Sequence, residues 1–458
     1  MWFSRSYPCQ RQAPGPRGLK LLGYWLTNRR DLLTTLQQCQ RDYGDLLRFS
    51  LGPKTVYVAC HPDMAEQILI RDLETFGSLS QQAKKVGLAL ILGNGLLQSY
   101  GEDWKRQRQM LQPLFHKRRV EKMAIHMTTA GEQLLQRWHS TYSPGEVINI
   151  LEEMVKVTLD IICRTLFSID VTTYLDTLQT TLPILIEHAA TSLKNPLLPP
   201  LNWPTPRNRR FKQALQTLDD IIYRLIQQRQ TSDEPNDDLL EFLLQTRDEI
   251  SGETLTRQPI RDQIATLLGV GHETTAAAMT WLWYTLEQHP LVLQRVQHEL
   301  ATVLAKRLPT LEDLPQLTYT RQVIDEVLRH YTPAPLVARL VLRDTEINGY
   351  PLPAGSTIFV SLYHIHHHPD FWVNPEQFWP ERFAAREENV KHRCAYLPFG
   401  VGPRLCLGNH FALLEMSLLL AQIAQRYTLK LVPHYLVKRE VTMTMRPGHG
   451  LLMRLYPR

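Results

Sequence analysis

Apolar residues recur with helical periodicity along most of the chain. Amphipathic segments with apolar residues at i, i+3, i+4 and i+7 predict helices over 102–140, 146–169, 208–230, 237–248, 258–288 and 290–305. Near the amino end, two short runs, 45–50 and 54–59, flank Gly52-Pro53. This arrangement predicts the two strands of a β-hairpin joined by a tight turn.

A second β-like stretch covers residues 337–360. Turn dipeptides at Asn348-Gly349 and Ala354-Gly355 divide it into shorter strands. The sequence shows no internal repeat of 20–50 residues and no flexible linker. We therefore expect a mainly α fold with a small β region, formed by residues 1–458 as a single domain.

The most apolar stretch, 264–286, is long enough to cross a bilayer. It carries His272 and Glu273 near its middle, and ionisable groups are costly in lipid, so we expect a buried core helix instead. The first residues form no apolar run, which argues against a signal peptide or amino-terminal anchor. Six cysteines without a C-x-x-C pair indicate a reduced, soluble, cytoplasmic protein. Peripheral contact with a membrane surface stays open.

Composition excludes several classes of protein. The chain has 43% hydrophobic and 21% charged residues, which excludes a disordered chain. Lys and Arg number 51 against 45 Asp and Glu, and this excess of +6 is spread without a basic tail. We therefore expect no nucleic-acid partner, although a mildly basic face can steer an acidic protein partner. The run Lys117-Arg118-Arg119 is interpreted as a solvated helix end, with partner docking as the alternative.

The sharpest local signal is the segment Phe399 to Gly408, FGVGPRLCLG, which precedes an apolar helical run over 410–423. Glycines on both sides of Cys406 let the backbone turn tightly and approach a flat partner. A sulfur near a helix amino terminus favours the thiolate, which is a nucleophile or a metal ligand. Arg404 is placed to pair with an anion beside it. The alternative is a buried structural cysteine in a glycine-rich turn.

The complete pattern F-x-x-G-x-R-x-C-x-G resembles the haem-binding signature of the cytochrome P-450 superfamily. The resemblance implies the family's α-rich triangular prism and the cofactor haem b. It implies that Cys406 is the axial ligand of the haem iron, the thiolate type that favours O–O cleavage. It also places Phe399, Arg404 and Gly408 in the cofactor-binding loop.

Two further motifs resemble structural elements of the same family. Glu326-Val327-Leu328-Arg329 matches E-x-x-R, and Pro380-Glu381-Arg382-Phe383 supplies the later segment with its arginine. The resemblance implies that Glu326, Arg329 and Arg382 form a buried structural triad supporting the haem pocket. The alternative for the first pair is a surface ion pair of little energetic value.

A further pair of motifs suggests contacts with the haem carboxylates. Trp104 and Arg108 match the family's W-x-x-x-R pattern and lie four residues apart on one helix face. Arg339 follows a proline-rich segment at the position of another propionate partner. The resemblance therefore implies that Trp104, Arg108 and Arg339 bind the cofactor. A surface tryptophan beside a basic helix is the alternative for the first two.

The segment Gly271 to Thr275 resembles the oxygen-activating motif A/G-G-x-D/E-T-T. The resemblance implies that Glu273 and Thr274 are catalytic and relay protons during dioxygen cleavage. A threonine hydroxyl bonded back to the preceding turn would bend the helix and open a groove there. Val270 stands where the family usually has a small residue, which narrows the space over the haem. The alternative is a kinked core helix without catalytic function.

Substrate contacts are expected from segments that differ between family members: the apolar loop 76–97, Val270 with Gly271, Leu336 with Val337, and the turn near Gly448-His449. The apolar loop, which includes Val86, suggests a hydrophobic substrate, and core packing under a loop is the alternative. The histidine run 364–368 looks like a metal cluster. It lacks separate acidic or cysteine ligands nearby and fits the family's H-x-x-P pattern, so we expect no metal there.

The resemblance implies a haem-dependent monooxygenase that inserts one oxygen atom of O2 into a C–H bond of a hydrophobic small molecule. The motif forms favour the fatty-acid and terpenoid hydroxylases. No fused reductase domain is visible, so electrons come from a separate ferredoxin, flavodoxin or reductase, and we expect a monomer. Two alternatives stay open: a peroxide-using or rearranging haem-thiolate enzyme, and a non-catalytic haem-thiolate sensor.

Overall fold

The computed structural model describes residues 12–18, 20–21, 23–24, 31–51, 54–81, 87–168, 174–194, 198–232, 236–247, 254–384 and 391–458. The chain divides into two compact units, 1–81 with 328–406 and 82–327 with 407–458. Each unit combines two segments that are distant in sequence, so no linker marks the division. The expected single domain over 1–458 stays a prediction. The Gly52-Pro53 turn and Val86 lie outside the described residues.

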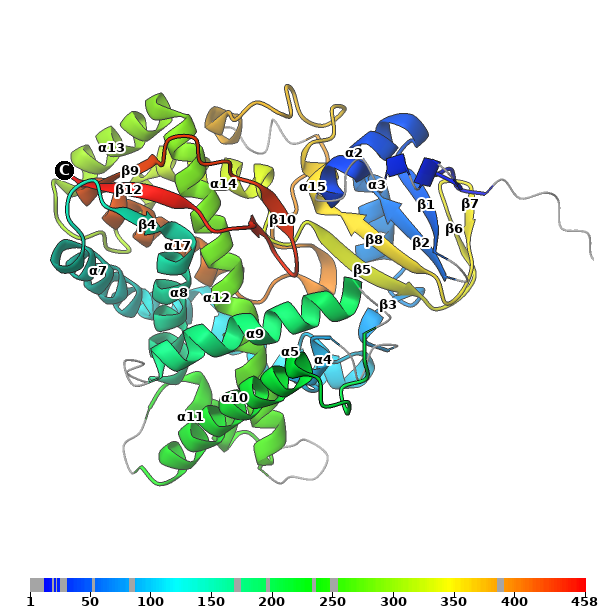
Figure 1. Cartoon of the computed structure of the whole chain (residues 1–458), viewed down its shortest axis with the longest axis horizontal. Helices are drawn as coiled ribbons and strands as arrows, with labels where there is room; N and C mark the ends of the chain where they lie inside the picture. Colours follow the sequence, from blue (N-terminus) through cyan, green and yellow to red (C-terminus); the bar gives the residue numbers. More distant parts are fainter. Residues whose placement is uncertain are drawn as a thin grey trace, which may run out of the picture. The chain divides into compact units, whose positions relative to one another are not determined.

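The first unit contains a five-stranded sheet in the order β1-β2-β8-β5-β3. β1 (Leu46–Leu51) and β2 (Lys54–Ala59) pair antiparallel, which confirms the predicted hairpin. β8 (Thr357–Ser361) runs parallel to β2 and antiparallel to β5 (Leu336–Val341), and β3 (Phe76–Gly77) pairs with β5. In Figure 1 the blue hairpin therefore lies beside yellow strands from the far part of the chain.

Strand alternation separates the side chains of this sheet into two apolar clusters. Leu46 and Ala59 belong to one cluster, whereas their neighbours Leu47 and Val58 pack with Leu36 in the other. The remaining elements of the unit are α2 (Leu32–Tyr43), α3 (Pro62–Glu66), η1 (Gln67–Arg71), η2 (Leu79–Gln81), β6 (Thr345–Ile347), β7 (Tyr350–Leu352), α15 (Leu362–His366), η6 (Pro380–Phe383) and η7 (Gly402–Arg404).

The second unit is mainly helical, with a three-stranded sheet β4-β12-β9 and a separate hairpin of β10 and β11. Its elements are α4 (Ala89–Leu92), α5 (Gly101–Leu111), η3 (Gln112–Phe115), α6 (Lys117–Lys122), α7 (Ala124–Thr141), β4 (Val147–Asn149), α8 (Ile150–Phe167), α9 (Leu175–Lys194), α10 (Pro206–Gln230), α11 (Leu239–Gln245), α12 (Arg257–Gln288), α13 (Pro290–Leu304), η5 (Leu314–Gln316), α17 (Asn409–Arg426), β9 (Tyr427–Leu431), β10 (Arg439–Val441), β11 (Met445–Pro447) and β12 (Leu452–Pro457). α14 (Thr318–His330) crosses the division between the units.

The predicted helices agree with the structure best in the middle of the chain, where α10, α11, α12 and α13 begin and end within a few residues of expectation. The predicted helix over 102–140 is divided by η3, because Pro113 has no N–H for an α-helical hydrogen bond. The segment predicted as helix from 146 begins as strand β4, and α8 starts only at Ile150.

α12 is the long helix at the centre of its unit in Figure 1, and it packs most closely on α8. A Cβ at Gly271 would lie 2.2 Å from Ile162 Cδ1, so the absence of a side chain there lets α12 approach α8. Thr158 of α8 donates to the His272 carbonyl at 3.1 Å. Most side chains of α12 are buried, as expected of a core helix. No helix in the described part of the chain is long and apolar enough to cross a membrane.

Candidate active site

The cysteine loop, which runs from Phe399 to Cys406, is held by backbone geometry that only glycine satisfies well. Gly400 and Gly402 have φ of 73° and 76°, in the left-handed region. A Cβ at Gly402 would also lie 2.2 Å from the Leu69 carbonyl oxygen of η1. The Cys406 N–H donates to the Phe399 carbonyl at 2.9 Å and closes the loop. These contacts fix the backbone that carries the sulfur.

Cys406 is exposed, whereas the other described cysteines are buried. Burial raises the pKa of each buried thiol, so none of those sulfurs is disposed to bind a metal as thiolate. Cys406 lies just before the amino end of α17, as the sequence predicts. A Cβ at Gly408 would meet nothing within 4 Å, which leaves open space beside the loop for a flat group.

Two arginines of the first unit form a positive site near this loop. Burial lowers the pKa of Arg339 to about 10, and burial together with the Arg339 charge lowers the pKa of Arg404 to about 10. The Arg339 guanidinium donates to the Ala338 carbonyl at 2.9 Å and, among the described residues, pairs with no carboxylate. Two neighbouring, partly desolvated cations fit a ligand with two carboxylates, as haem has.

The two arginines of the expected structural triad are both buried. Arg329 donates to the His366 carbonyl at 2.7 Å, and Arg382 donates to the Gln377 carbonyl at 3.1 Å. Both guanidiniums lie over the Trp372 ring, at 5.1 and 5.8 Å from its centroid. Glu326 is fully buried one turn before Arg329 on α14, which excludes the surface ion pair as an interpretation.

In the second unit, α12 presents the two residues expected to be catalytic. Thr274 Oγ1 donates to the Val270 carbonyl at 3.0 Å, which is the predicted bond back to the preceding turn. Glu273 is buried, and its Oε1 accepts a hydrogen bond of 2.9 Å from Thr444. Arg446 Nη1 lies 3.6 Å from the same oxygen. His272 is also buried, and burial lowers its pKa, which keeps the ring neutral.

The other expected site residues take varied positions. Val270 is 37% exposed, whereas Gly271 contacts Ile162 and serves helix packing. Trp104 and Arg108 are half-buried one turn apart on α5, and their contact with a haem carboxylate stays a prediction.

Leu336 and Val337 were expected to line one pocket, but strand β5 directs them to opposite faces of the sheet. Leu336 packs in the cluster of Leu36 and Leu47, whereas Val337 packs in the cluster of Ala59 and Val360. Successive side chains of a strand point in opposite directions, so at most one of the two can face a substrate.

The four histidines near α15 bond individually to the protein and do not converge. His364 contacts the Ser361 hydroxyl and the Leu33 carbonyl, and His367 contacts the Tyr363 carbonyl. His368 Nε2 lies 3.3 Å from Asp45 Oδ1. Asp45, His61 and His368 lie close enough together to hold a metal ion, so the expectation of no metal at this run stays a prediction.

Glu66, His392 and Cys394 lie close enough together to resemble a metal site. The Cys394 N–H donates to His392 Nδ1 at 3.0 Å, so the neutral ring carries its proton on Nε2. That nitrogen lies 3.3 Å from Glu66 Oε2 and 3.1 Å from Asp63 Oδ1, where it donates rather than binds a cation. We interpret the group as a hydrogen-bonded cluster.

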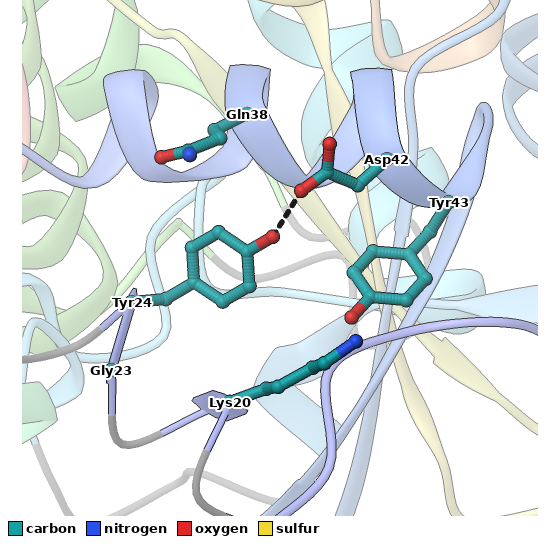
Figure 2. A pocket seen from close by; sticks show the side chains of 6 residues that line it. All are labelled: Lys20, Gly23, Tyr24, Gln38, Asp42 and Tyr43. Atoms are coloured by element: carbon teal, nitrogen blue, oxygen red, sulfur yellow. Dashed lines mark hydrogen bonds between the residues drawn. The ribbon is translucent and has the colours of Figure 1, made fainter.

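A surface pocket of about 440 Å³ lies elsewhere in the first unit, between α2 and the segment before it. Figure 2 shows the Tyr24 hydroxyl bonded to the Asp42 carboxylate at its centre. This hydrogen bond is the main reason that the pKa of Tyr24 is raised. The phenol and the acid satisfy each other, and we assign no ligand to this pocket.

Three features escaped the sequence reasoning: the contacts of Glu273 with Thr444 and Arg446, the buried Glu415, and the His366 ring, whose Nε2 accepts a hydrogen bond of 2.7 Å from the Leu397 N–H. Glu415 is fully buried on α17, and burial raises its pKa well above the usual range. A single acid within the apolar run 411–424 was the available signal. The other contacts join residues that are far apart in sequence, and no local pattern marks them.

The comparisons with known proteins agree on one family. Residues 13–453 match the model of the Cytochrome P-450 family. The chain is 35% identical to "Cyclooctatin synthase" of Streptomyces melanosporofaciens, covering 96% of this chain and 94% of that protein. It is 32% identical to "Pentalenene oxygenase" of Streptomyces avermitilis, covering 91% of each. The crystal structure of the cytochrome P450DA heme domain superposes with a TM-score of 0.87 at 25% identity, covering 98% of each chain.

Proposed function

Since the chain belongs to the cytochrome P-450 family, we propose that it hydroxylates a terpenoid substrate with O2 and electrons from a separate redox partner. Members of the family are haem-dependent monooxygenases, and haem is the cofactor of this chain. The observation that carries the proposal is the exposed Cys406 in a loop whose backbone is held by glycines. Two cations, Arg339 and Arg404, belong to the same site, and among the described residues Arg339 pairs with no carboxylate. The terpenoid class is supported by the relatives "Cyclooctat-9-en-7-ol 5-monooxygenase" and "Pentalenene oxygenase".

The cofactor-binding roles follow from the chemistry of the loop. The Cys406 thiolate would hold the haem iron, and the Arg339 and Arg404 guanidiniums would hold the propionates. Trp104 and Arg108 provide further propionate contacts. When bound, haem supplies the activation of dioxygen and the transfer of one oxygen atom to the substrate.

The residues of α12 supply the protons. The overall reaction is RH + O2 + 2 H⁺ + 2 e⁻ → ROH + H2O, so two protons must reach dioxygen for each hydroxylation. The Thr274 hydroxyl holds a proton near the site, and its bond to the Val270 carbonyl fixes its position. The Glu273 carboxylate passes protons through Oε2, because Oε1 is occupied by Thr444. Val270 borders the substrate beside this pair.

The test is the ferrous–CO difference spectrum of the purified protein beside that of Cys406→Ser. A red-shifted Soret band in the wild type only would support thiolate ligation by Cys406. Titration with polycyclic terpenoid alcohols, followed by Soret shift, would then identify the substrate class. No haem binding, or a histidine-type spectrum in the wild type, would overturn the proposal.

Turnover assays separate the two alternatives. A monooxygenase fed by a ferredoxin, a flavodoxin or a reductase needs both NAD(P)H and O2 for product formation. A peroxide-using or rearranging enzyme forms product without them. A haem-thiolate sensor binds haem but shows no substrate-dependent electron consumption with any of these donors.

A further inference from the structure

Glu273, to which the proposed function gives proton transfer, is held by a hairpin from the carboxyl end of the chain. β10 and β11 pair antiparallel, with Val441 opposite Met445 and the tip residues between them. From this hairpin, Thr444 Oγ1 donates to Glu273 Oε1 at 2.9 Å, and Arg446 Nη1 lies 3.6 Å from the same oxygen. Both contacts therefore fall on one oxygen of the carboxylate.

Burial makes these two contacts important for Glu273. Its side chain is 9% exposed and that of Arg446 is 29% exposed. A buried carboxylate without a partner is strongly unfavourable, and a contact with a cation offsets part of that cost. Arg446 is therefore the half-buried member of this ion pair and Glu273 the buried one.

The other ionisable groups around this part of α12 leave Arg446 as the charged partner. His272, on the same helix, is kept neutral by burial, and Glu415 on α17 is kept protonated by burial. Glu440 of β10 is the residue opposite Arg446 in the hairpin, so its carboxylate belongs to the strand that pairs with the arginine. Among the described residues, Arg446 is the cation within ion-pair distance of Glu273.

The hairpin is fixed to α12 at a second point. Trp281 Nε1 donates to the Met445 carbonyl at 2.9 Å, about two turns after Glu273. Within the tip, the Thr442 N–H donates to the Thr444 carbonyl at 3.1 Å. Thr444 and Met445 are both buried. The backbone that carries the two partners of Glu273 is therefore held in place on both sides.

Resting on the proton-transfer role of Glu273, we propose that Thr444 and Arg446 are positioning residues that fix the Glu273 carboxylate through Oε1 and leave Oε2 to carry the proton. The hairpin thereby acts on hydroxylation without touching the reacting atoms. Without either contact, the carboxylate adopts other rotamers and no longer delivers protons in the way that cleaves the O–O bond. Dioxygen then leaves as peroxide, O2 + 2 H⁺ + 2 e⁻ → H2O2, with the same use of electrons and protons but no product.

The experiment measures product and peroxide per NAD(P)H consumed by the holoenzyme with its redox partner. We expect Arg446→Gln and Thr444→Val to lower product yield about 3- to 10-fold, below the roughly 100-fold or greater loss on removing a general acid. Arg446→Lys should restore most of the yield because it keeps the charge. The matched control is Arg454→Gln, at a half-buried arginine of β12 bonded to the Gly145 carbonyl.

The decisive comparison uses the Glu273→Gln background. If Arg446 acts through Glu273, Arg446→Gln has no further effect on yield once the acid is gone. Independent effects that multiply would overturn the positioning role. If Glu273→Gln itself leaves yield unchanged, the proton-transfer assignment fails instead, so the two failures are distinguishable.

A readout without turnover completes the test. Chemical denaturation of the four proteins in the Glu273/Arg446 cycle measures whether the two side chains interact in the folded protein. We expect the double substitution to lower the denaturation midpoint by less than the two single losses combined. Additive losses would show that the pair does not interact and would overturn the proposal.

Discussion

Arg329 and His366 are bonded in both directions. The Arg329 guanidinium donates to the His366 carbonyl at 2.7 Å, and the His366 ring Nδ1 contacts the Arg329 carbonyl at 3.2 Å. The Leu397 N–H donates to His366 Nε2 at 2.7 Å, so the ring proton is on Nδ1. The Gly400 N–H in turn donates to the Leu397 carbonyl at 3.0 Å. His366 thus connects the end of α14 to the cysteine loop.

His366→Leu should destabilise the protein and weaken its hold on haem. The substitution leaves the Arg329 carbonyl and the Leu397 N–H buried without partners, at about 1–3 kcal/mol each. The measurement is the free energy of unfolding in denaturant together with haem content. His298→Leu, at an exposed histidine of α13, is the control. Equal losses in the two variants would contradict this role.

Gly402→Ala should prevent formation of the cysteine loop, while Gly349→Ala should cost only backbone strain. Both glycines have positive φ, 76° and 78°, and a side chain there costs about 1–2 kcal/mol. Only at Gly402 does a Cβ meet a backbone oxygen, that of Leu69, whereas nothing lies near Gly349. Haem content and the thermal midpoint of unfolding are measured. Normal haem content in Gly402→Ala would refute the steric argument.

Arg339→Gln and Arg404→Gln should change haem affinity and apoprotein stability in opposite directions. Each lost charge-assisted hydrogen bond of about 1.5–3 kcal/mol weakens haem binding roughly 10- to 150-fold, so one substitution alone should not empty the site. Because burial lowers both arginine pKa values, removing one charge should leave the apoprotein as stable or more stable.

Transfer of haem to apomyoglobin measures the affinity, and denaturation of the apoprotein measures the stability. Arg343→Gln, at an exposed arginine just after β5, is the matched control. A substitution that destabilises the apoprotein and leaves haem transfer unchanged would show that the arginines serve the fold and not the cofactor.

Thr274→Ala should keep haem but divert electrons to peroxide, because the hydroxyl that holds the proton is lost. We expect product per NAD(P)H to fall about 10-fold or more. Thr280→Ala is a matched control on the same helix, since Thr280 also bonds back to a carbonyl, that of Ala276, at 2.7 Å. Fully coupled product formation in Thr274→Ala would remove Thr274 from the proton relay.

Glu415→Gln should flatten the dependence of stability on pH. Burial raises the folded-state pKa of Glu415, so the folded protein binds a proton that the unfolded chain releases above its ordinary pKa of about 4.3. The stabilisation that this bound proton provides is therefore complete below the unfolded-state pKa and is lost as the pH rises toward the folded-state pKa. Unfolding free energies between pH 4 and pH 8 should fall less in Glu415→Gln than in the wild type. Identical curves would contradict this assignment.

Local sequence patterns predicted much of the site because its chemistry depends on neighbouring residues. The glycines around Cys406 and the bond from Thr274 to Val270 are local features, and the structure places both as expected. The buried environment of Arg329 followed from motif resemblance. The structure separates Leu336 from Val337, because adjacent strand residues face opposite ways, and the substrate contact of either residue stays a prediction.

Contacts between distant segments were not predictable from one sequence. Thr444 and Glu273 are 171 residues apart, and nothing in either segment specifies the other. The short strands β4 and β9 have weak alternation, so the sheet that they form with β12 was missed. α9 was missed as well, since Pro183 in its interior argues against a helix.

The pairing of β2 with β8 also determines when the first unit can form during synthesis. β2 ends at Ala59 and β8 at Ser361, so the ribosome must add roughly 300 residues before the parallel pairing is complete. At about 5–20 residues per second, the nascent hairpin keeps an unpaired edge for roughly 15–60 seconds. An unpaired edge is a template for association with other chains. Expression at high ribosome loading should therefore favour aggregation, and slower synthesis with chaperones present should increase the yield of folded protein.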